Sequence, residues 1–188
     1  ISACNDRATR TTTSSAPRCS SSPTAWAARR RARSRPRWPS SRSAPACPTV
    51  TNLGHIDDGP SAGPVLLPFS PNFSGTTYTH IFVNNNGNVT FNSPLTTWVP
   101  FTISSSTPPI IAPFFADVDT RNPPNTGPVT YGNTTFNGFT AFCVNWINVG
   151  EYNQITSVKN SFQLLIVERS DTGAGNFDIY MNYDKIQW

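Results

Sequence analysis

The fold is decided by one stretch, IIAPFFADVDTR at residues 110–121, in which two carboxylates interrupt a run of mostly apolar or small residues. Residues two apart on an extended strand point to the same face, so we expect Asp117 and Asp119 on one face of a buried strand. The alternating apolar segments before and after this stretch need such a strand to pack on. The sequence therefore predicts that residues 110–121 form the centre of a domain.

The segments around this centre have the periodicity of strands rather than helices. Residues 139–149 and 162–167 are apolar on both faces, which is typical of strands inside a sandwich. Residues 177–183 alternate between apolar and polar and predict a half-exposed strand. A short strand is expected at 129–131, with turns at 153–159 and 171–176. Together these segments predict an all-β, antiparallel sandwich.

A hairpin is predicted before the central stretch, because Asn86–Gly87 lies between two alternating apolar runs. Asn-Gly favours a two-residue type I′ turn, since both positions need a positive φ. Such a turn would place Asn85 opposite Asn88 and Phe82 opposite Phe91.

Three segments in this order resemble the NIDO module of nidogen, alpha-tectorin and mucin-4-type extracellular proteins: VNNNGNVTF, IIAPFFADVDTR and NFDIYMNYDKIQW. The resemblance runs from about Pro64 to Trp188. The family pattern continues beyond Ile-Gln-Trp, so we expect the module to be incomplete at its C-terminal end, with an exposed sheet edge.

The resemblance implies a non-enzymatic extracellular module, secreted or at the cell surface. It implies a role in cell–matrix adhesion or extracellular assembly, with an extracellular protein or glycan as the partner. The Asp-Val-Asp motif at residues 117–119 belongs to the resemblance, which implies no catalytic role for it.

Charge divides the chain into two parts. Residues 1–48 hold ten Arg and one acid, a net charge of +9, whereas residues 49–188 hold four bases and nine acids, a net charge of −5. Of the first 48 residues, 35 are Arg, Ser, Ala or Pro, too few apolar groups to offset the entropy of ordering, so we predict disorder. The predicted organisation is a basic segment at 1–48, a lead-in loop at 49–63 and the β domain at 64–188.

Three interpretations of the basic segment stay open. The run at residues 28–37 has the composition of an arm that binds nucleic acid through its phosphates. It also fits a solvated linker. A third hypothesis, which we favour, is that residues 1–48 arise from translation of a GC-rich gene out of frame. On that hypothesis no nucleic-acid partner is expected.

The cysteines and the apolar runs bear on three features: a zinc site, a disulfide, and a signal or membrane segment. Cys143 is the one cysteine of four in the β-rich part, and no C-x-x-C pair occurs, which argues against zinc. We expect Cys143 to be a small buried apolar residue and the domain to lack a disulfide. The longest apolar run near the N-terminus, residues 25–28, is far too short for a signal or membrane segment. The sequence gives no indication of oligomeric state.

Asp117 and Asp119 are the candidate metal ligands. Between apolar neighbours they are expensive to bury without donors or a cation, so a structural calcium ion is one interpretation. The alternative is that they end a strand, accept backbone N–H groups or pair with Arg121. Asp57-Asp58-Gly59 lacks the alternate-residue spacing of an EF-hand loop and is predicted to be a solvent-exposed turn. No other cofactor is indicated.

We expect no enzymatic activity. His55 and His80 are the available general bases near neutral pH, and no nucleophile elbow, phosphate loop or zinc motif occurs. An alternative is a carbohydrate-active enzyme or carbohydrate-binding module that uses Asp117, Asp119 and Glu168, which would require carboxylates converging in a cleft.

The remaining candidate sites are on the predicted surface. N-x-S/T sequons make Asn72, Asn88 and Asn133 possible glycosylation sites in a secreted chain. Trp98 and Tyr152 lie in loop-like sequence and are the candidate surface contacts.

Overall fold

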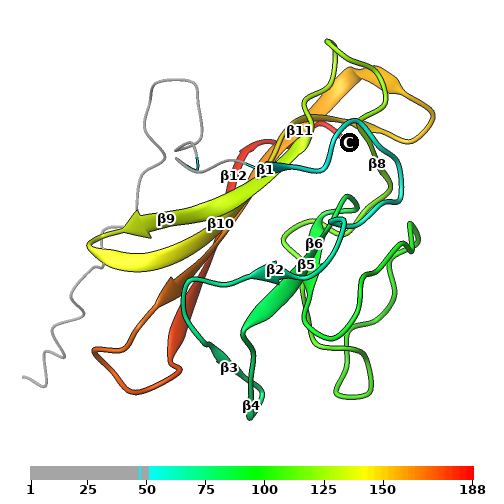
Figure 1. Ribbon diagram of the computed structural model, residues 1–188. Helices are drawn as coiled ribbons and strands as arrows, with labels where there is room; N and C mark the ends of the chain where they lie inside the picture. The colour runs from blue at the N-terminus through cyan, green and yellow to red at the C-terminus, as the bar shows by residue number, and fades with distance from the viewer. Residues whose placement is uncertain (1–46, 48–50) are drawn as a thin grey trace, which may run out of the picture. The chain divides into compact units, whose positions relative to one another are not determined.

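The computed structural model describes Cys47 and residues 51–188, which lie in one unit of the chain, Pro36–Trp188. The predictions of disorder, nucleic-acid binding and mistranslation for the basic segment fall outside the described residues. Within the described residues all regular structure is β-strand (Figure 1). The predicted all-β, antiparallel class is confirmed.

The larger sheet is antiparallel and contains the longest strands. Its order is β1-β9-β10-β11-β12, and β8 pairs with the far end of β10. The bounds are β1 Thr51–Asn52, β8 Val118–Asp119, β9 Val129–Phe136, β10 Phe139–Glu151, β11 Ile155–Glu168 and β12 Phe177–Lys185. The strands predicted at 139–149, 162–167 and 177–183 are therefore present. The turn predicted at 153–159 is wrong in extent, because β11 already begins at Ile155.

The smaller sheet faces these long strands and has the order β2-β5-β6-β7 (Figure 1). Its strands are β2 Val65–Leu66, β5 His80–Asn84, β6 Asn88–Thr90 and β7 Ile110–Ile111. A separate two-stranded ribbon consists of β3 Asn72–Phe73 and β4 Thr76–Thr77. The two main sheets give the sandwich that the alternating pattern predicted.

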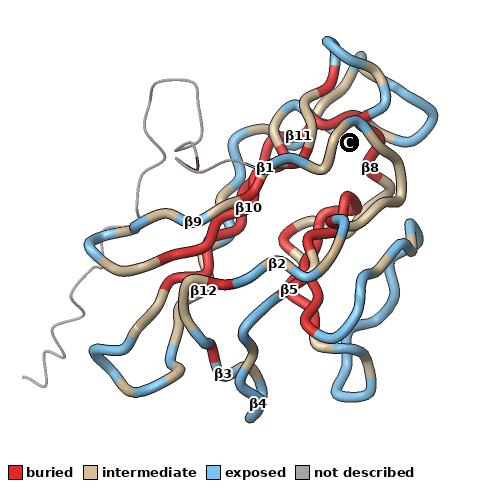
Figure 2. The backbone as a smooth tube through the Cα atoms, viewed as in Figure 1, coloured by how far each residue is buried: buried red, intermediate tan, exposed pale blue. Residues whose placement is uncertain are grey.

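The main core fills the space between the two sheets. Trp146 on β10 is fully buried and stacks on Phe162 of β11 with ring centroids 4.9 Å apart. Ile81, Val83 and Val89 of the smaller sheet belong to the same cluster. The buried residues accordingly gather on β10, on β11 and on the β5–β6 hairpin (Figure 2).

A second, smaller apolar cluster covers the outer face of the large sheet. It contains Ala141, Leu165, Val167 and a disulfide between Cys47 and Cys143. The prediction of a free cysteine in a domain without a disulfide is therefore wrong. Cys47 precedes the β domain and is 96 residues away in sequence, and neither composition nor spacing indicates that pairing.

The central stretch is buried, but it is not one strand. Ile110 and Ile111 pair with β6 in the smaller sheet, whereas Val118 and Asp119 pair with β10 in the larger one. Residues 112–117 are irregular and cross from one sheet to the other. The prediction that both carboxylates share one face of a single strand is wrong, because Asp119 is in β8 whereas Asp117 precedes it in the irregular segment.

The predicted hairpin exists with a different register. Asn84 pairs with Asn88 and Phe82 with Thr90, so the loop has three residues, with Gly87 at φ 74°. The predicted type I′ turn at Asn86–Gly87 is therefore wrong. The same dipeptide does form a two-residue turn at Asn137–Gly138, between β9 and β10, where φ is 52° and 85°.

Strand β12 lies at the edge of the large sheet. Ile179, Met181 and Tyr183 pair with core residues of β11 and so point to the core side of the sheet. They are nevertheless 39%, 41% and 49% exposed, so this edge of the sheet is only partly covered. The core side of β12 thus remains partly open to solvent.

Candidate functional site

The tip of the β5–β6 hairpin, the three loop residues and the flanking pair Asn84 and Asn88, is buried although every residue in it is Asn or Gly. We call it the asparagine turn. Trp146 Nε1 donates to Asn85 O at 3.0 Å, and Val118 N donates to Asn86 Oδ1 at 3.0 Å. The turn therefore satisfies polar groups of the large sheet and joins the two sheets through hydrogen bonds.

The asparagine turn also holds two segments that are distant in sequence. Asn85 N donates to Gly59 O at 2.8 Å, and Asn86 Nδ2 donates to Asp58 Oδ1 at 2.7 Å. On the other side, Asn85 Nδ2 donates to Val118 O. The lead-in segment and the start of β8 are thus fixed on either side of one buried turn.

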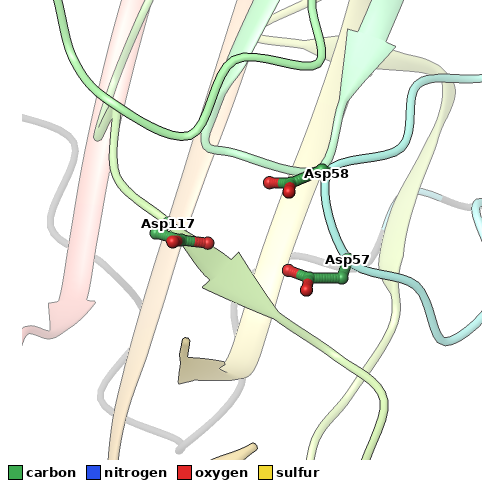
Figure 3. A group of neighbouring side chains, drawn as sticks. All are labelled: Asp57, Asp58 and Asp117. Carbon is green, nitrogen blue, oxygen red and sulfur yellow. The ribbon is translucent and has the colours of Figure 1, made fainter. Parts of the chain in front are cut away.

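Three carboxylates meet where these segments run side by side. Asp57, Asp58 and Asp117 each offer an oxygen within 4.8 Å of the others, and we call them the acidic cluster. Figure 3 shows the carboxylates turned toward a shared space, with Asp57 and Asp58 on one side and Asp117 on the other. An antiparallel bridge between Asp57 and Asp119 aligns the two segments. The prediction of a solvent-exposed Asp57-Asp58-Gly59 turn is wrong, because the three residues are only partly exposed.

Asp119 differs from the cluster because donors from Arg121 and Gln154 already satisfy its carboxylate. Arg121 Nε and Nη2 donate to its two oxygens at 3.0 and 2.6 Å, and the N–H groups of Arg121 and Gln154 donate at 2.9 and 3.0 Å. Burial alone would raise the pKa of Asp119, but these hydrogen bonds hold it below its ordinary value. Asp119 therefore has the contacts expected of the strand-end alternative rather than those of a free metal ligand.

In the acidic cluster the pKa values of Asp57 and Asp117 are shifted in the opposite direction, upward. Burial, followed by the carboxylates of Asp58, Asp57 and Asp119, raises the pKa of Asp117 to about 6. Burial and the Asp119 carboxylate also raise the pKa of Asp57, although Arg121 Nη2 binds Asp57 Oδ2 at 2.7 Å. The cluster is short of positive charge, and oxygen ligands of this kind suit a hard cation.

The structure does not bring Glu168 to the predicted carboxylate pair. Val118, beside Asp117, pairs with Glu151, and Glu151 also pairs with Ile155 at the start of β11. Glu168 ends that 14-residue strand, so it lies roughly 40 Å away at about 3.3 Å per residue. Asp117, Asp119 and Glu168 therefore cannot converge on one glycosidic bond.

The predicted glycosylation and contact residues differ in exposure. Asn72 and Asn133 are exposed, but Asn88 is 0% exposed inside the asparagine turn, which keeps a glycan off it in the folded domain. Trp98 and Tyr152 are 54% and 56% exposed. Both are available as surface contacts.

The sequence points to one member of the acidic cluster, Asp117, but not to the other two. Asp117 stood out because it interrupts an apolar run. Asp57 and Asp58 lie about 60 residues earlier in polar, Gly-rich sequence, where acidic residues are common. The Asp57–Asp119 bridge and the hydrogen bonds of the asparagine turn bring them to Asp117, and no local pattern encodes those contacts.

Comparison with known families supports the resemblance found in the sequence. Residues 40–183 match the family model described as NIDO related. The chain belongs to the NIDO-related family. The match contains both sheets except for the last residues of β12, and it contains the whole acidic cluster.

Two curated relatives are alpha-tectorins. The Gallus gallus protein is 27% identical over 166 residues, which cover 77% of this chain and 8% of that protein. The Mus musculus protein is 31% identical over 159 residues, which cover 73% of this chain and 7% of that protein. The chain thus corresponds to a small part of these relatives. No solved structure matches it.

Family and relatives together support an extracellular module. Nothing that the structure describes in residues 51–188 is a helix able to cross a membrane.

Proposed function

We propose that this NIDO-related domain acts in adhesion or extracellular assembly by binding a protein or glycan through an exposed loop. The observation that supports this is an apolar group on the loop between β6 and β7. Trp98, Val99 and Ile103 are 54%, 59% and 53% exposed there. Aromatic and aliphatic side chains held in water at this density favour a contact surface.

The base of this loop is fixed by the asparagine turn. Asn84 Oδ1 accepts from Leu95 N at 3.0 Å, and Asn86 Nδ2 donates to Thr97 O at 3.2 Å. Further along, Phe101 packs edge-on against Phe115 with centroids 5.3 Å apart. Trp98 therefore lies between two anchored points, so that binding orders little additional chain.

A hollow of about 500 Å³ lies beside the end of the same loop. Phe73, Ile103, Pro109 and Ile110 give it apolar walls, and Ser104 and Thr107 add hydroxyl groups. Its size is within the range of known ligand sites. The loop and the hollow together offer an apolar surface with a few polar groups, as expected for recognition of a protein side chain or a sugar.

The test is binding of the full chain to a solubilised extracellular matrix preparation, with and without glycosidase treatment of the matrix. Trp98→Ala should weaken binding at least about tenfold, since truncating a central tryptophan typically removes more than 1.4 kcal/mol. Glycosidase treatment separates glycan from protein ligands.

Leu66→Ala is the matched control, because Leu66 is also apolar and 74% exposed but lies on β2. It should bind as the unmodified chain does. Equal binding by Trp98→Ala and the unmodified chain would contradict the proposal, and so would an equal loss in both variants.

A further inference from the structure

The acidic cluster has oxygen atoms that the polypeptide does not satisfy. Asp57 Oδ1 and Asp117 Oδ1 are both buried without a hydrogen-bond partner. A carboxylate oxygen that has left water without gaining a donor raises the free energy of the folded state. Both atoms belong to carboxylates that face the shared space in Figure 3. They retain the capacity to bind a positively charged ligand.

The charges around the cluster are also unbalanced. Arg121 Nη2 contacts Asp119 at 2.6 Å and Asp57 at 2.7 Å, so its charge is already shared between two carboxylates. Asp58 and Asp117 form no ion pair within the described part of the chain. Carboxylates this close repel one another unless a proton or a cation lies between them.

A neutral oxygen supplies an independent observation. Asn85 is 0% exposed, and its Oδ1 has no hydrogen-bond partner. Its backbone N–H donates to Gly59 O, and its side-chain N–H donates to Val118 O. The amide therefore reaches between the two segments that carry the three aspartates. A buried amide oxygen without a donor in this place is a further available cation ligand.

We propose that Asp57, Asp58 and Asp117 bind a calcium ion, with Asn85 Oδ1 as an additional ligand. The ion would tie the lead-in segment to the start of β8 and neutralise the repulsion among the carboxylates. The proposal is independent of the loop-binding function, because Trp98 has no part in it.

Calcium fits the donor set better than other common cations. All the available donors are oxygens, whereas zinc prefers nitrogen and sulfur ligands. Magnesium demands near-ideal octahedral geometry and retains water, whereas calcium accepts irregular sets of carboxylate and amide oxygens. Sites in extracellular modules bind calcium with dissociation constants of about 10⁻⁴ to 10⁻³ M, so the affinity need not be high.

The experiment uses the full 188-residue chain after treatment with a chelator. Calcium at about ten times its dissociation constant should raise Tm by roughly 3–6 °C, and magnesium should raise it less. Terbium should give luminescence on indole excitation, because Trp146 donates to Asn85 O at 3.0 Å, and calcium should quench it. No shift in Tm and no luminescence would overturn the proposal.

Two variants test the ligands. Asp117→Asn and Asp58→Asn keep the size of the side chain, and Asn tolerates the positive φ of Asp58, 48°. Both should abolish the calcium shift and the terbium signal while remaining folded without calcium, because each removes repulsion. Asp184→Asn, at an exposed aspartate on β12, should respond as the unmodified chain does. A calcium response that survives in both cluster variants, or that disappears in Asp184→Asn, would show that the site lies elsewhere.

Discussion

Gly87 lies in the asparagine turn with φ at 74°, directly against the carbonyl oxygen of Phe114. A Cβ atom at this position would collide with that backbone oxygen. Phe114 N also donates to Gly87 O at 3.2 Å, so the two backbones are held in contact. The absence of a side chain at one residue thus allows the small sheet to meet the segment that crosses between the sheets.

Gly87→Ala should therefore destabilise the domain by more than about 3 kcal/mol, through a positive φ and a collision with fixed backbone. The free energy of unfolding in urea measures it. Gly138→Ala is the control: its φ is similar, at 85°, but a Cβ there meets nothing within 4 Å. It should cost only about 1–2 kcal/mol. Equal losses in the two variants would show that the contact with Phe114 contributes nothing.

Individual residues differ in how far the sequence predicts their burial. The cost of burying Asp117 was predictable from its apolar neighbours. The four asparagines around Gly87 were not predictable as buried residues, because Asn and Gly normally indicate a surface turn. They are buried because Val118 and Trp146 offer backbone and indole groups that need partners, and those partners come from other parts of the chain.

At the level of elements, the Cys47–Cys143 disulfide fastens the chain before β1 to the middle of β10. Asn145 Nδ2 also donates to Cys47 Sγ at 3.2 Å, and Cys47 is 1% exposed. The bond closes a long loop, with a sequence separation of 96. It therefore lowers the conformational entropy of the unfolded chain strongly.

Cys143→Ser should lower the free energy of unfolding by about 4–5 kcal/mol, as expected for a loop of this length. Urea denaturation with and without a reductant measures the effect. The unmodified chain should lose a similar amount when it is reduced, and the variant should not respond to the reductant. A reductant effect that persists in Cys143→Ser would mean that other cysteines provide the stabilisation.

The strands differ in how far sequence predicts them. The segment 139–149, which is apolar on both faces, was predicted with nearly correct bounds because periodicity depends on the segment alone. The strand predicted at 162–167 was too short, because it already begins at Ile155. The two Asn-Gly turns show the limit. At Asn137–Gly138 the strands pair right up to the dipeptide, whereas at Asn86–Gly87 buried contacts to other segments draw one more residue into the loop. Tertiary contacts, not the dipeptide, select the register.

Across the whole domain, Tyr183 links the open edge of the large sheet to the other layer. Its hydroxyl donates to Pro113 O at 2.6 Å, in the segment that follows β7. Partial burial raises the pKa of Tyr183 above its ordinary value. The unfolded chain therefore loses this proton first as the pH rises.

The domain should consequently lose stability above about pH 10, where tyrosine ionises in the unfolded chain, and this residue should contribute no change below that pH. Between pH 8 and about pH 11 the free energy of unfolding of Tyr183→Phe should fall less than that of the unmodified chain. Urea midpoints at the two pH values measure the difference. Burial raises the pKa of Tyr131 in the same direction, so Tyr131→Phe should behave alike. An unchanged alkaline loss in both variants would contradict this.

The sandwich fold was predictable from the sequence, whereas the contacts between segments distant in sequence were not. Strand periodicity and turn residues gave the class, and family motifs gave the type of domain. Three features depend on contacts between distant segments. They are the crossing of residues 110–121 from one sheet to the other, the Cys47–Cys143 disulfide, and the proximity of Asp57 to Asp117. Period and composition carry no information about which distant segment a strand will meet.

The length of β10 has a practical consequence. One end of this strand is the turn at Asn137–Gly138, where a Cβ on the glycine meets nothing, and the other end pairs with Val118 beside the acidic cluster. Thirteen strand residues separate them, roughly 40 Å at about 3.3 Å per residue. Exposed turn tips of this kind accept insertions. A fluorophore or affinity tag placed there would report on the domain without touching the carboxylates.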